Sequence, residues 1–284
     1  MQKNKEHSQR DEISPITNKE EDKVPTSALT YDELYLKPHK CKIFARTDSY
    51  WNDSYGAQLD AQPNSKVIVF GLPKSGNTFL VSLLSQCLGL EIIDPLEQIG
   101  EKGVGMTHRP FSATIADRMD LVHGLVLLRD LRDIIASFYD YSQTHFFRTA
   151  RPEFQYTTIE SFYYDWFLSR IDKCLRVEDY VAEYARVGVP VVRYEALIAN
   201  PVGELSRIFH CLGLEVAEVR IQQTVQKLSF DNLKTQGLKF GQLEIPQTHF
   251  AVGRCNRYKH VLTPEVLDDI RTRYANFFTR WGYS

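Results

Sequence analysis

Apolar residues follow two patterns along the chain, unbroken runs and helical spacing. Unbroken runs of valine, isoleucine and leucine predict buried strands at 66–70, 90–95, 122–129 and 189–194. Apolar residues three and four positions apart predict helices at 79–88, 133–142, 159–168 and 171–186. Buried strands that alternate with helices are typical of a parallel sheet. The pattern therefore predicts an α/β fold, with helices on both faces of a parallel sheet.

The rest of the chain is less regular. Residues 1–25 are charged and polar, which predicts a disordered tail before a single domain at 26–284. Residues 144–157 are predicted as a loop, and residues 229–262 lack periodicity, as a functional lid often does. Further helices are predicted at 195–199, 202–212, 215–228 and from Pro264 to about Trp281, with Thr263 as an N-cap.

The end of the first predicted strand carries a candidate anion site. A glycine-bearing loop between a strand and a helix aims backbone N–H groups at one point, where a phosphate is the natural guest. Gly71, Gly76 and Thr78 match the nucleotide-binding pattern G-x-x-x-x-G-K-[ST]. Asn77 replaces the lysine of that pattern, and Lys74 places a cation inside the loop instead. Nucleoside triphosphate hydrolysis is therefore disfavoured, and a tight turn with an exposed lysine is the simpler alternative.

Three other residues are candidates, although each has a simpler structural explanation. Arg129 ends a predicted strand and suits a phosphate, but pairing with Asp130 or Asp133 would explain it equally well. Ser137 lies on the following helix and could add a hydroxyl to the same anion. His108 lies in a predicted loop, where a lone histidine is usually a surface residue.

Several of these residues are expected at one edge of the sheet. The glycine-bearing loop, Arg129 and Tyr194 each follow a predicted strand. Ligands of parallel α/β sheets bind at the carboxyl ends of the strands. We therefore expect these three features to lie together, although Tyr194 could equally be a core residue.

Four segments resemble motifs of the sulfotransferases that use 3′-phosphoadenosine 5′-phosphosulfate (PAPS). Residues 73–78 are similar to P-K-S-G-T-T, and residues 107–110 to T-H-x-P. Residues 128–139 are similar to R-N-P-K-D-x-x-x-S-x-Y, and residues 194–201 to Y-E-D-L-x-x-x-P. Residues 250–259 match R-K-G-x-x-G-D-W-K more weakly. The resemblance implies a P-loop-like nucleotide-binding fold and sulfuryl transfer from PAPS to a hydroxyl or amine of a small-molecule acceptor.

The resemblance also implies a role for individual residues and requires no metal. His108 is the implied catalytic base, and Lys74 stabilises charge on the leaving phosphate. Arg129 and Ser137 are implied to bind the 3′-phosphate, and Tyr194 to lie near the adenine. The remaining implied cofactor contacts are Ser75, Gly76, Asn77, Thr78, Phe79, Gly253 and Arg254.

Two departures from the family pattern keep other functions open. Met106 stands where many members have a lysine, and Ala251 replaces an arginine that clamps the 3′-phosphate. Arg254 or Arg257 could supply that missing charge. The alternatives are an ATP-dependent P-loop kinase or NTPase and a catalytically silent nucleotide-binding homologue.

Composition limits the partners of this 284-residue chain. A net charge of −2 gives no global attraction to nucleic acid, and no apolar run is long enough to cross a membrane. The polar N-terminus is not expected to act as a signal peptide, and five scattered cysteines favour free thiols, so the expected location is cytoplasmic. Lys259 and Thr263 resemble part of a family dimer patch, which leaves a homodimer open. The acceptor is expected near Tyr141, His145, Phe146 and Phe147, opposite residues 31–55.

Overall fold

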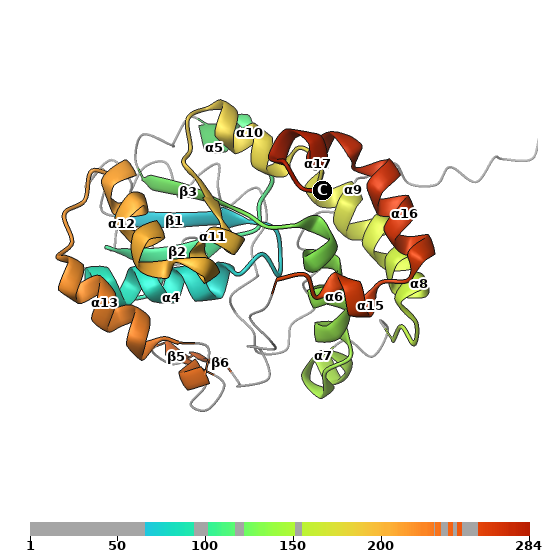
Figure 1. Ribbon diagram of the computed structural model, residues 1–284, viewed down its shortest axis with the longest axis horizontal. Helices are drawn as coiled ribbons and strands as arrows, with labels where there is room; N and C mark the ends of the chain where they lie inside the picture. The colour runs from blue at the N-terminus through green and yellow to red at the C-terminus, as the bar shows by residue number, and fades with distance from the viewer. Residues whose placement is uncertain are drawn as a thin grey trace, which may run out of the picture.

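A four-stranded parallel sheet forms the centre of the protein, in the order β2-β1-β3-β4 (Figure 1). The computed structural model describes residues 66–93, 102–116, 122–150, 155–229, 231–233, 238–240, 243–245 and 255–284. The strands are β1 (Lys66–Gly71), β2 (Gly103–Thr107), β3 (His123–Leu128) and β4 (Val191–Arg193). Two further strands, β5 (Leu238–Phe240) and β6 (Leu243–Ile245), form an antiparallel pair. The predicted α/β class and parallel sheet are confirmed.

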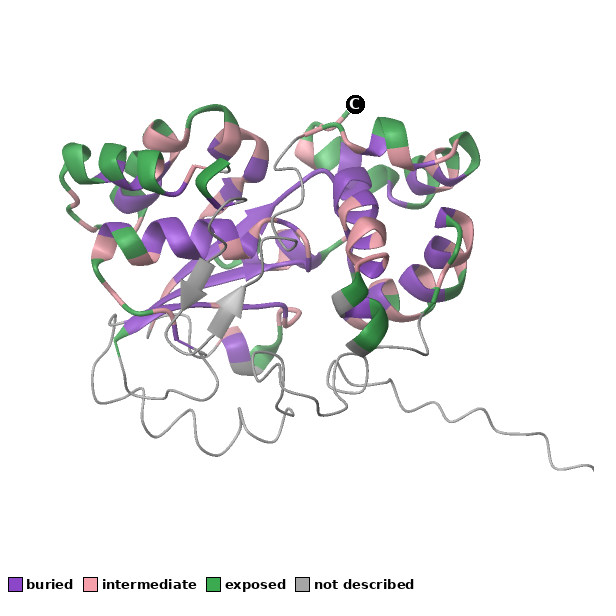
Figure 2. Ribbon diagram, turned by 90° about the horizontal axis from the view of Figure 1, so that it is seen from below, coloured by how far each residue is buried: buried purple, intermediate pink, exposed green. Residues whose placement is uncertain are grey.

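Both faces of β1 are apolar, and each face packs in its own hydrophobic cluster. Val67 and Val69 join a cluster with helix α4 (Asn77–Leu88), because alternate side chains of a strand point to the same face. Ile68 and Phe70 join the second cluster on the opposite face. The sheet is therefore buried on both faces, as Figure 2 shows, and helices cover each side as predicted.

Two groups of helices provide this cover. Besides α4, the Val67 side is covered by α11 (Tyr194–Ala199), α12 (Pro201–Cys211) and α13 (Glu218–Lys227). The Ile68 side is covered by α6 (Leu131–Ser142), η3 (Phe162–Asp172), α10 (Tyr180–Arg186), α16 (Pro264–Arg273) and α17 (Ala275–Trp281). Shorter helices are α5 (Ala113–Ala116), α7 (His145–Ala150), α8 (Ile159–Ser161), α9 (Lys173–Leu175) and α15 (Tyr258–Val261).

The sequence prediction differs from the structure at several places, including 229–262, where β5, β6 and α15 form. Over its described residues 90–93, the predicted strand at 90–95 forms only a bridge between Ile92 and Val104. Strand β2, which the sequence did not predict, pairs with β1. It contains Gly103 and Gly105, and glycines are more typical of a connection between elements than of a strand. A Cβ on Gly103 would lie 2.5 Å from the side chain of Ile93, so close packing explains a glycine there. Helix α7 replaces part of the loop predicted at 144–157.

The predicted helical segments are more finely divided than expected. Residues 159–186 form α8, the π-helix η3, α9 and α10 in succession. The last predicted helix breaks at Tyr274 into α16 and α17, and Thr263 occupies the N-cap position without a side-chain hydrogen bond to the helix. The tail at 1–25 and the proposed start of the domain lie outside the described residues and stay predictions. Within the described part of the chain, no helix is long and apolar enough to span a membrane.

Candidate active site at the carboxyl edge of the sheet

The carboxyl ends of the four parallel strands bring the predicted site residues to one edge. The glycine-bearing loop follows β1, His108 follows β2, Arg129 follows β3, and Tyr194 follows β4. Direct contacts link all four positions: Arg129 contacts the loop and Tyr194, and His108 contacts the Gly71 carbonyl. Sequence reasoning placed the loop, Arg129 and Tyr194 at this edge, but it missed β2 and therefore the reason why His108 joins them.

The loop between β1 and α4 depends on two residues in the left-handed backbone region. Lys74 has φ 69°, and Gly76, the N-cap of α4, has φ 102°. The backbone N–H of Ser75 donates to the carbonyl of Leu72 at 3.1 Å and closes the turn. A Cβ on Gly76 would lie 2.5 Å from the ring of Tyr194, so both the backbone conformation and the close approach require glycine.

Ser75 leaves a buried hydroxyl group without a partner inside this loop. Its side chain is 0% exposed, and its Oγ has no hydrogen-bond partner in the described part of the chain. A buried hydroxyl without a partner costs free energy, which a bound acceptor would recover. Together with the N-terminus of the 12-residue helix α4, this orphaned donor fits an anion such as a phosphate.

Lys74 supplies the cation of the loop. Its ammonium lies 4.3 Å from the centre of the Tyr141 ring on α6. Burial, together with the positive charge of Arg129, lowers the pKa of Lys74 to about 8, against the opposing effect of the Asp140 carboxylate. A nearby anion would favour the charged amine and raise this pKa again.

His108 is buried behind the loop instead of exposed. The residue is 7% exposed, and its Nδ1 lies 2.6 Å from the carbonyl oxygen of Gly71. Since a carbonyl can only accept, Nδ1 carries the proton and Nε2 carries the lone pair. Burial and the charge of Lys74 lower the pKa of His108 to about 4, although the Gly71 hydrogen bond opposes this. The imidazole is therefore neutral near pH 7, and its pKa lies below the ordinary value expected from the sequence.

Arg129 connects the loop to the other elements of the site. Its Nη1 donates to the carbonyl of Lys74 at 2.8 Å, and its guanidinium lies 4.3 Å from the centre of the Tyr194 ring. Its Nη2 also lies 3.9 Å from the carboxylate of Asp133. Of the two ion pairs that the sequence suggested for Arg129, the one with Asp133 forms at this long distance. Asp130 pairs with Arg132 instead.

One face of α6 points toward the loop. Asp133 contacts Arg129, and Tyr141 contacts Lys74. Ser137 lies between them at four-residue spacing, so it shares this helix face. Ser137 therefore lies on the face of α6 that carries the contacts to Arg129 and Lys74, and its role as an anion ligand stays a prediction.

Asp133 also anchors the C-terminal segment. Its carboxylate accepts hydrogen bonds from the backbone N–H groups of Asn256 and Tyr258, at 2.8 and 3.0 Å. Arg257, between them, pairs with Asp140 on α6, so its charge is already engaged. The predicted contacts Gly253 and Arg254, with Ala251, lie outside the described residues.

The side chains of the first turn of α4 differ in their surroundings. Asn77 is 4% exposed, and its Nδ2 donates to the carbonyl of Leu72 at 2.9 Å, so the side chain turns into the fold. Phe79 packs in the cluster between α4 and the sheet, while Thr78 is half-buried. Sequence patterns place all three next to the loop but do not reveal the direction of their side chains.

The aromatic residues expected on the acceptor side are only partly placed. The Tyr141 and Phe147 rings lie 5.4 Å apart, and Phe147 also packs against Trp166. His145 is exposed, whereas the side chain of Phe146 and all of residues 31–55 lie outside the described set. Tyr141 is therefore the aromatic that the structure brings to the loop.

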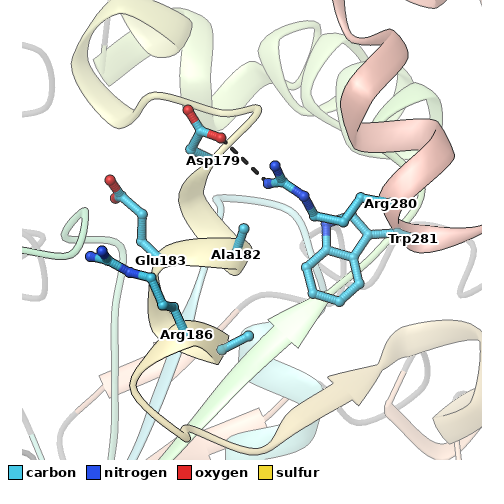
Figure 3. Close-up of a pocket in the computed structure, with 7 residues that line it drawn as sticks. Asp179, Ala182, Glu183, Arg186, Arg280 and Trp281 are labelled. Atoms are coloured by element: carbon cyan, nitrogen blue, oxygen red, sulfur yellow. Dashed lines mark hydrogen bonds and ion pairs between the residues drawn. The ribbon is translucent and has the colours of Figure 1, made fainter.

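A separate hollow of about 500 Å³ lies between α10 and α17 (Figure 3). Arg280 bridges the two helices with a 3.4 Å contact to Asp179, and Trp281 forms one wall. Arg186 and Glu183 add one charge of each sign to the lining. This hollow uses side chains of two helices, not the strand ends, and its charges balance.

Comparison with known proteins identifies the family. Residues 102–282 match the model of the sulfotransferase domain. The chain belongs to the sulfotransferase family. The matched stretch includes His108, Arg129, Ser137 and Tyr194 and begins after the glycine-bearing loop. No curated protein sequence matches the chain.

Solved structures share the fold of this sulfotransferase. Mouse sulfotransferase SULT7A1, complexed with PAP, is 16% identical with a TM-score of 0.60, over 82% of this chain and 90% of the other. Retinol dehydratase in a complex with retinol and PAP is 15% identical with a TM-score of 0.61, over 81% and 86%. Retinol dehydratase with androsterone and inactive cofactor PAP is 14% identical with a TM-score of 0.58, over 76% and 81%. These matches confirm the predicted P-loop-like sulfotransferase fold.

Replacing Gly76 is expected to destabilise the protein more than replacing a glycine of similar backbone conformation. Gly76→Ala and Gly188→Ala both place alanine at positive φ, 102° and 87°, which costs roughly 1–2 kcal/mol. Only at Gly76 would the new Cβ also meet Tyr194, since nothing lies within 4 Å at Gly188. Urea unfolding of the two variants measures the difference, and equal losses would show that the Tyr194 contact is unimportant.

The stability of the protein is expected to fall between about pH 6.5 and pH 4, partly because of His108. The unfolded chain takes up the imidazole proton near pH 6.5, whereas the folded protein does so only near a pKa of about 4. Within this window the unfolded state binds more protons, so the free energy of unfolding decreases as the pH falls. The variant His108→Gln lacks this contribution. Urea unfolding should show a stability difference between wild type and variant that shrinks toward low pH; a constant difference contradicts the assignment.

Proposed function

We propose that this sulfotransferase transfers the sulfuryl group of PAPS to a hydroxyl or amine of a small-molecule acceptor. The observation that carries the proposal is the gathering of Lys74, the buried Ser75 hydroxyl, His108 and Arg129 at the edge where the strands end. When bound, PAPS supplies an activated sulfuryl group on a 5′-phosphate that can leave. The described residues fit its phosphates, because an orphaned hydroxyl, two cations and a helix N-terminus all lie at one point.

The loop residues are proposed to hold the 5′-phosphate. The hydroxyl of Ser75 and the backbone N–H groups from Gly76 to Phe79 are the donors, with the Thr78 hydroxyl beside them. The contribution of Asn77 would come from its backbone, because its side chain is used elsewhere. Lys74 would place its charge where negative charge develops on the leaving phosphate.

Arg129, Ser137 and Tyr194 are proposed to select the nucleotide. Arg129 and Ser137 would bind the 3′-phosphate that distinguishes PAPS from ATP, while the Tyr194 ring would lie near the adenine. Gly253 and Arg254, which lie outside the described residues, complete the proposed set. Arg129 is already oriented by the Lys74 carbonyl, so its guanidinium is held in place before an anion arrives.

His108 is proposed as the base that takes the acceptor's proton. The Gly71 hydrogen bond keeps a proton on Nδ1, which leaves Nε2 as the nitrogen that can accept one. A pKa of about 4 makes a weak base, and the charge of Lys74 contributes to that low value. A phosphate beside Lys74 would offset this charge and raise the pKa of His108 toward the range of an effective base.

The two alternative functions are less well supported by this geometry. An ATP-dependent kinase or NTPase would use a lysine at position 77, where the asparagine side chain bonds to the loop carbonyl instead. A silent nucleotide-binding homologue would keep the phosphate ligands without needing a buried histidine of fixed tautomer. A cytoplasmic location and a homodimer stay predictions from the sequence.

PAP is expected to stabilise the protein more than AMP or ATP with Mg²⁺, because only PAP carries a 3′-phosphate. A ligand that binds only the folded state adds about 2.7 kcal/mol at a hundred times its Kd, so thermal unfolding will detect it. Ser137→Ala should weaken PAP binding by about tenfold or more, since a hydrogen bond to a charged group contributes about 1.5–3 kcal/mol.

AMP binding and the exposed-serine variant Ser206→Ala are the matched controls. Ser206 lies on α12 and donates only to its own helix, so its variant should bind PAP like the wild type. Stabilisation by ATP with Mg²⁺ alone would favour the kinase. No shift with any nucleotide would contradict a PAPS site.

His108→Gln is expected to keep PAP binding and to lose sulfuryl transfer. A positioned base contributes typically 10²–10⁴-fold in rate, so the loss should fall in that range. Transfer from radiolabelled PAPS to a panel of phenols, alcohols and amines measures it. Transfer at the wild-type rate would exclude His108 as the base, and a wild type that binds PAP but transfers to no acceptor would indicate the silent homologue.

A further inference from the structure

The side chain of Asn77 lies among the groups that hold His108. Its Nδ2 is 2.9 Å from the carbonyl oxygen of Leu72 and 3.4 Å from that of Gly71. The same Nδ2 lies 3.5 Å from Nδ1 of His108. The Asn77 amide and the His108 imidazole therefore both face the Gly71 carbonyl oxygen, which lies 2.6 Å from Nδ1 of His108.

The orientation of the Asn77 amide follows from its neighbours. The reverse orientation would place Oδ1 against the carbonyl oxygen of Leu72, where two acceptors repel each other. With Nδ2 facing the carbonyls, Oδ1 is buried without a hydrogen-bond partner among the described residues. A buried acceptor without a partner is costly, so a side chain needed only to fill space would be better apolar. The amide donor is thus the feature that justifies asparagine here.

Gly71 and Asn77 are also matched in shape. A Cβ on Gly71 would lie 2.1 Å from Oδ1 of Asn77, so any side chain there would displace the amide. The glycine therefore lets Asn77 reach across the start of the loop to both carbonyls. This pairing fixes the direction of the Gly71 carbonyl, on which the proton position of His108 depends.

The two tautomers of His108 differ in what this carbonyl can accept. With the proton on Nδ1, the ring donates to Gly71 at 2.6 Å. With the proton on Nε2, two lone pairs would face each other at that distance, and Asn77 could donate to Nδ1 only at 3.5 Å, the limit of a hydrogen bond. The Gly71 carbonyl therefore selects the first tautomer as long as it keeps its direction.

We propose that Asn77 is a positioning residue that holds the Gly71 carbonyl and thereby keeps the proton of His108 on Nδ1, with Nε2 left to receive a proton. This inference rests on the proposed role of His108 as the base. It does not require Asn77 to touch the cofactor or the acceptor. It gives the asparagine at the lysine position of the nucleotide-binding loop pattern a function of its own.

The test measures the tautomer directly in the complete chain without nucleotide. Histidine labelled with ¹⁵N in the ring gives distinct signals for protonated and unprotonated nitrogens, and the loss of one set in His108→Gln identifies His108 among the eight histidines. Wild type should show a protonated Nδ1 and an unprotonated Nε2. Asn77→Leu keeps a similar volume without the donor, and it should move both signals toward the average of two exchanging tautomers.

Two further variants separate positioning from loosening of the helix. Ser82→Ala removes another hydrogen bond from a 3% exposed side chain of α4, to the Thr78 carbonyl, and should leave the His108 signals unchanged. Asn77→Ala repeats the test if Asn77→Leu does not fold. The pH titration of the same spectra should give a His108 pKa near 4 in wild type and a lower one in the Asn77 variants, because burial persists while the Gly71 hydrogen bond that raises the pKa is weakened.

The outcomes distinguish this inference from the proposed function. A wild-type proton on Nε2, unchanged signals in the Asn77 variants, or the same change in Ser82→Ala would each overturn the positioning role. PAP binding to the same samples tests the PAPS site separately. If PAP fails to bind while the tautomer responds as expected, the proposed function is wrong and the positioning of His108 by Asn77 stands.

Discussion

The parallel pairing of β1 with β2 and β3 is the constraint on which the rest of the site depends. The register joins Phe70 to Thr107 on one side and to Val126 on the other, so the three strands end almost level. The residues that follow them then share one edge. Because both faces of β1 are covered, backbone polar groups at this edge are shielded from water, and His108 and the loop are buried by the same packing.

Burial at this edge determines the electrostatics of the site. Burial and the charge of Arg129 lower the pKa of the Lys74 amine, and burial together with the charge of Lys74 lowers the pKa of His108, which keeps the imidazole neutral near pH 7. Asp133 and Asp140 on α6 provide the nearest opposing charges. A positive charge in a poorly hydrated site attracts an anion more strongly than the same charge in water would. The family to which the chain belongs is one of enzymes that handle such an anionic group.

Asp133 shows how one side chain links several elements of the fold. It approaches Arg129 and accepts from the backbone of Asn256 and Tyr258, so β3, α6 and the C-terminal segment meet at one carboxylate. Arg129 extends this link to the loop through the Lys74 carbonyl and to α11 through the Tyr194 ring. A substitution of Asp133 or Arg129 would therefore remove contacts to several elements at this edge of the sheet.

The amino-acid pattern by itself determined β1 and β3 from unbroken apolar runs, and α4 and α6 from apolar residues at helical spacing. The glycines marked the loop between β1 and α4. It also determined which chemical groups follow the strands, including Lys74 and Arg129. Only the tertiary structure decided that 103–107 becomes a strand, since pairing with β1 and the close approach of Ile93 to Gly103 stabilise the extended backbone. The buried, neutral state of His108 was likewise decided there, because the Gly71 carbonyl and the Lys74 charge are distant from it in sequence and meet it only in the folded chain. The direction of the Asn77 side chain depends on the nearby carbonyls of Gly71 and Leu72, whose orientation the folded loop sets.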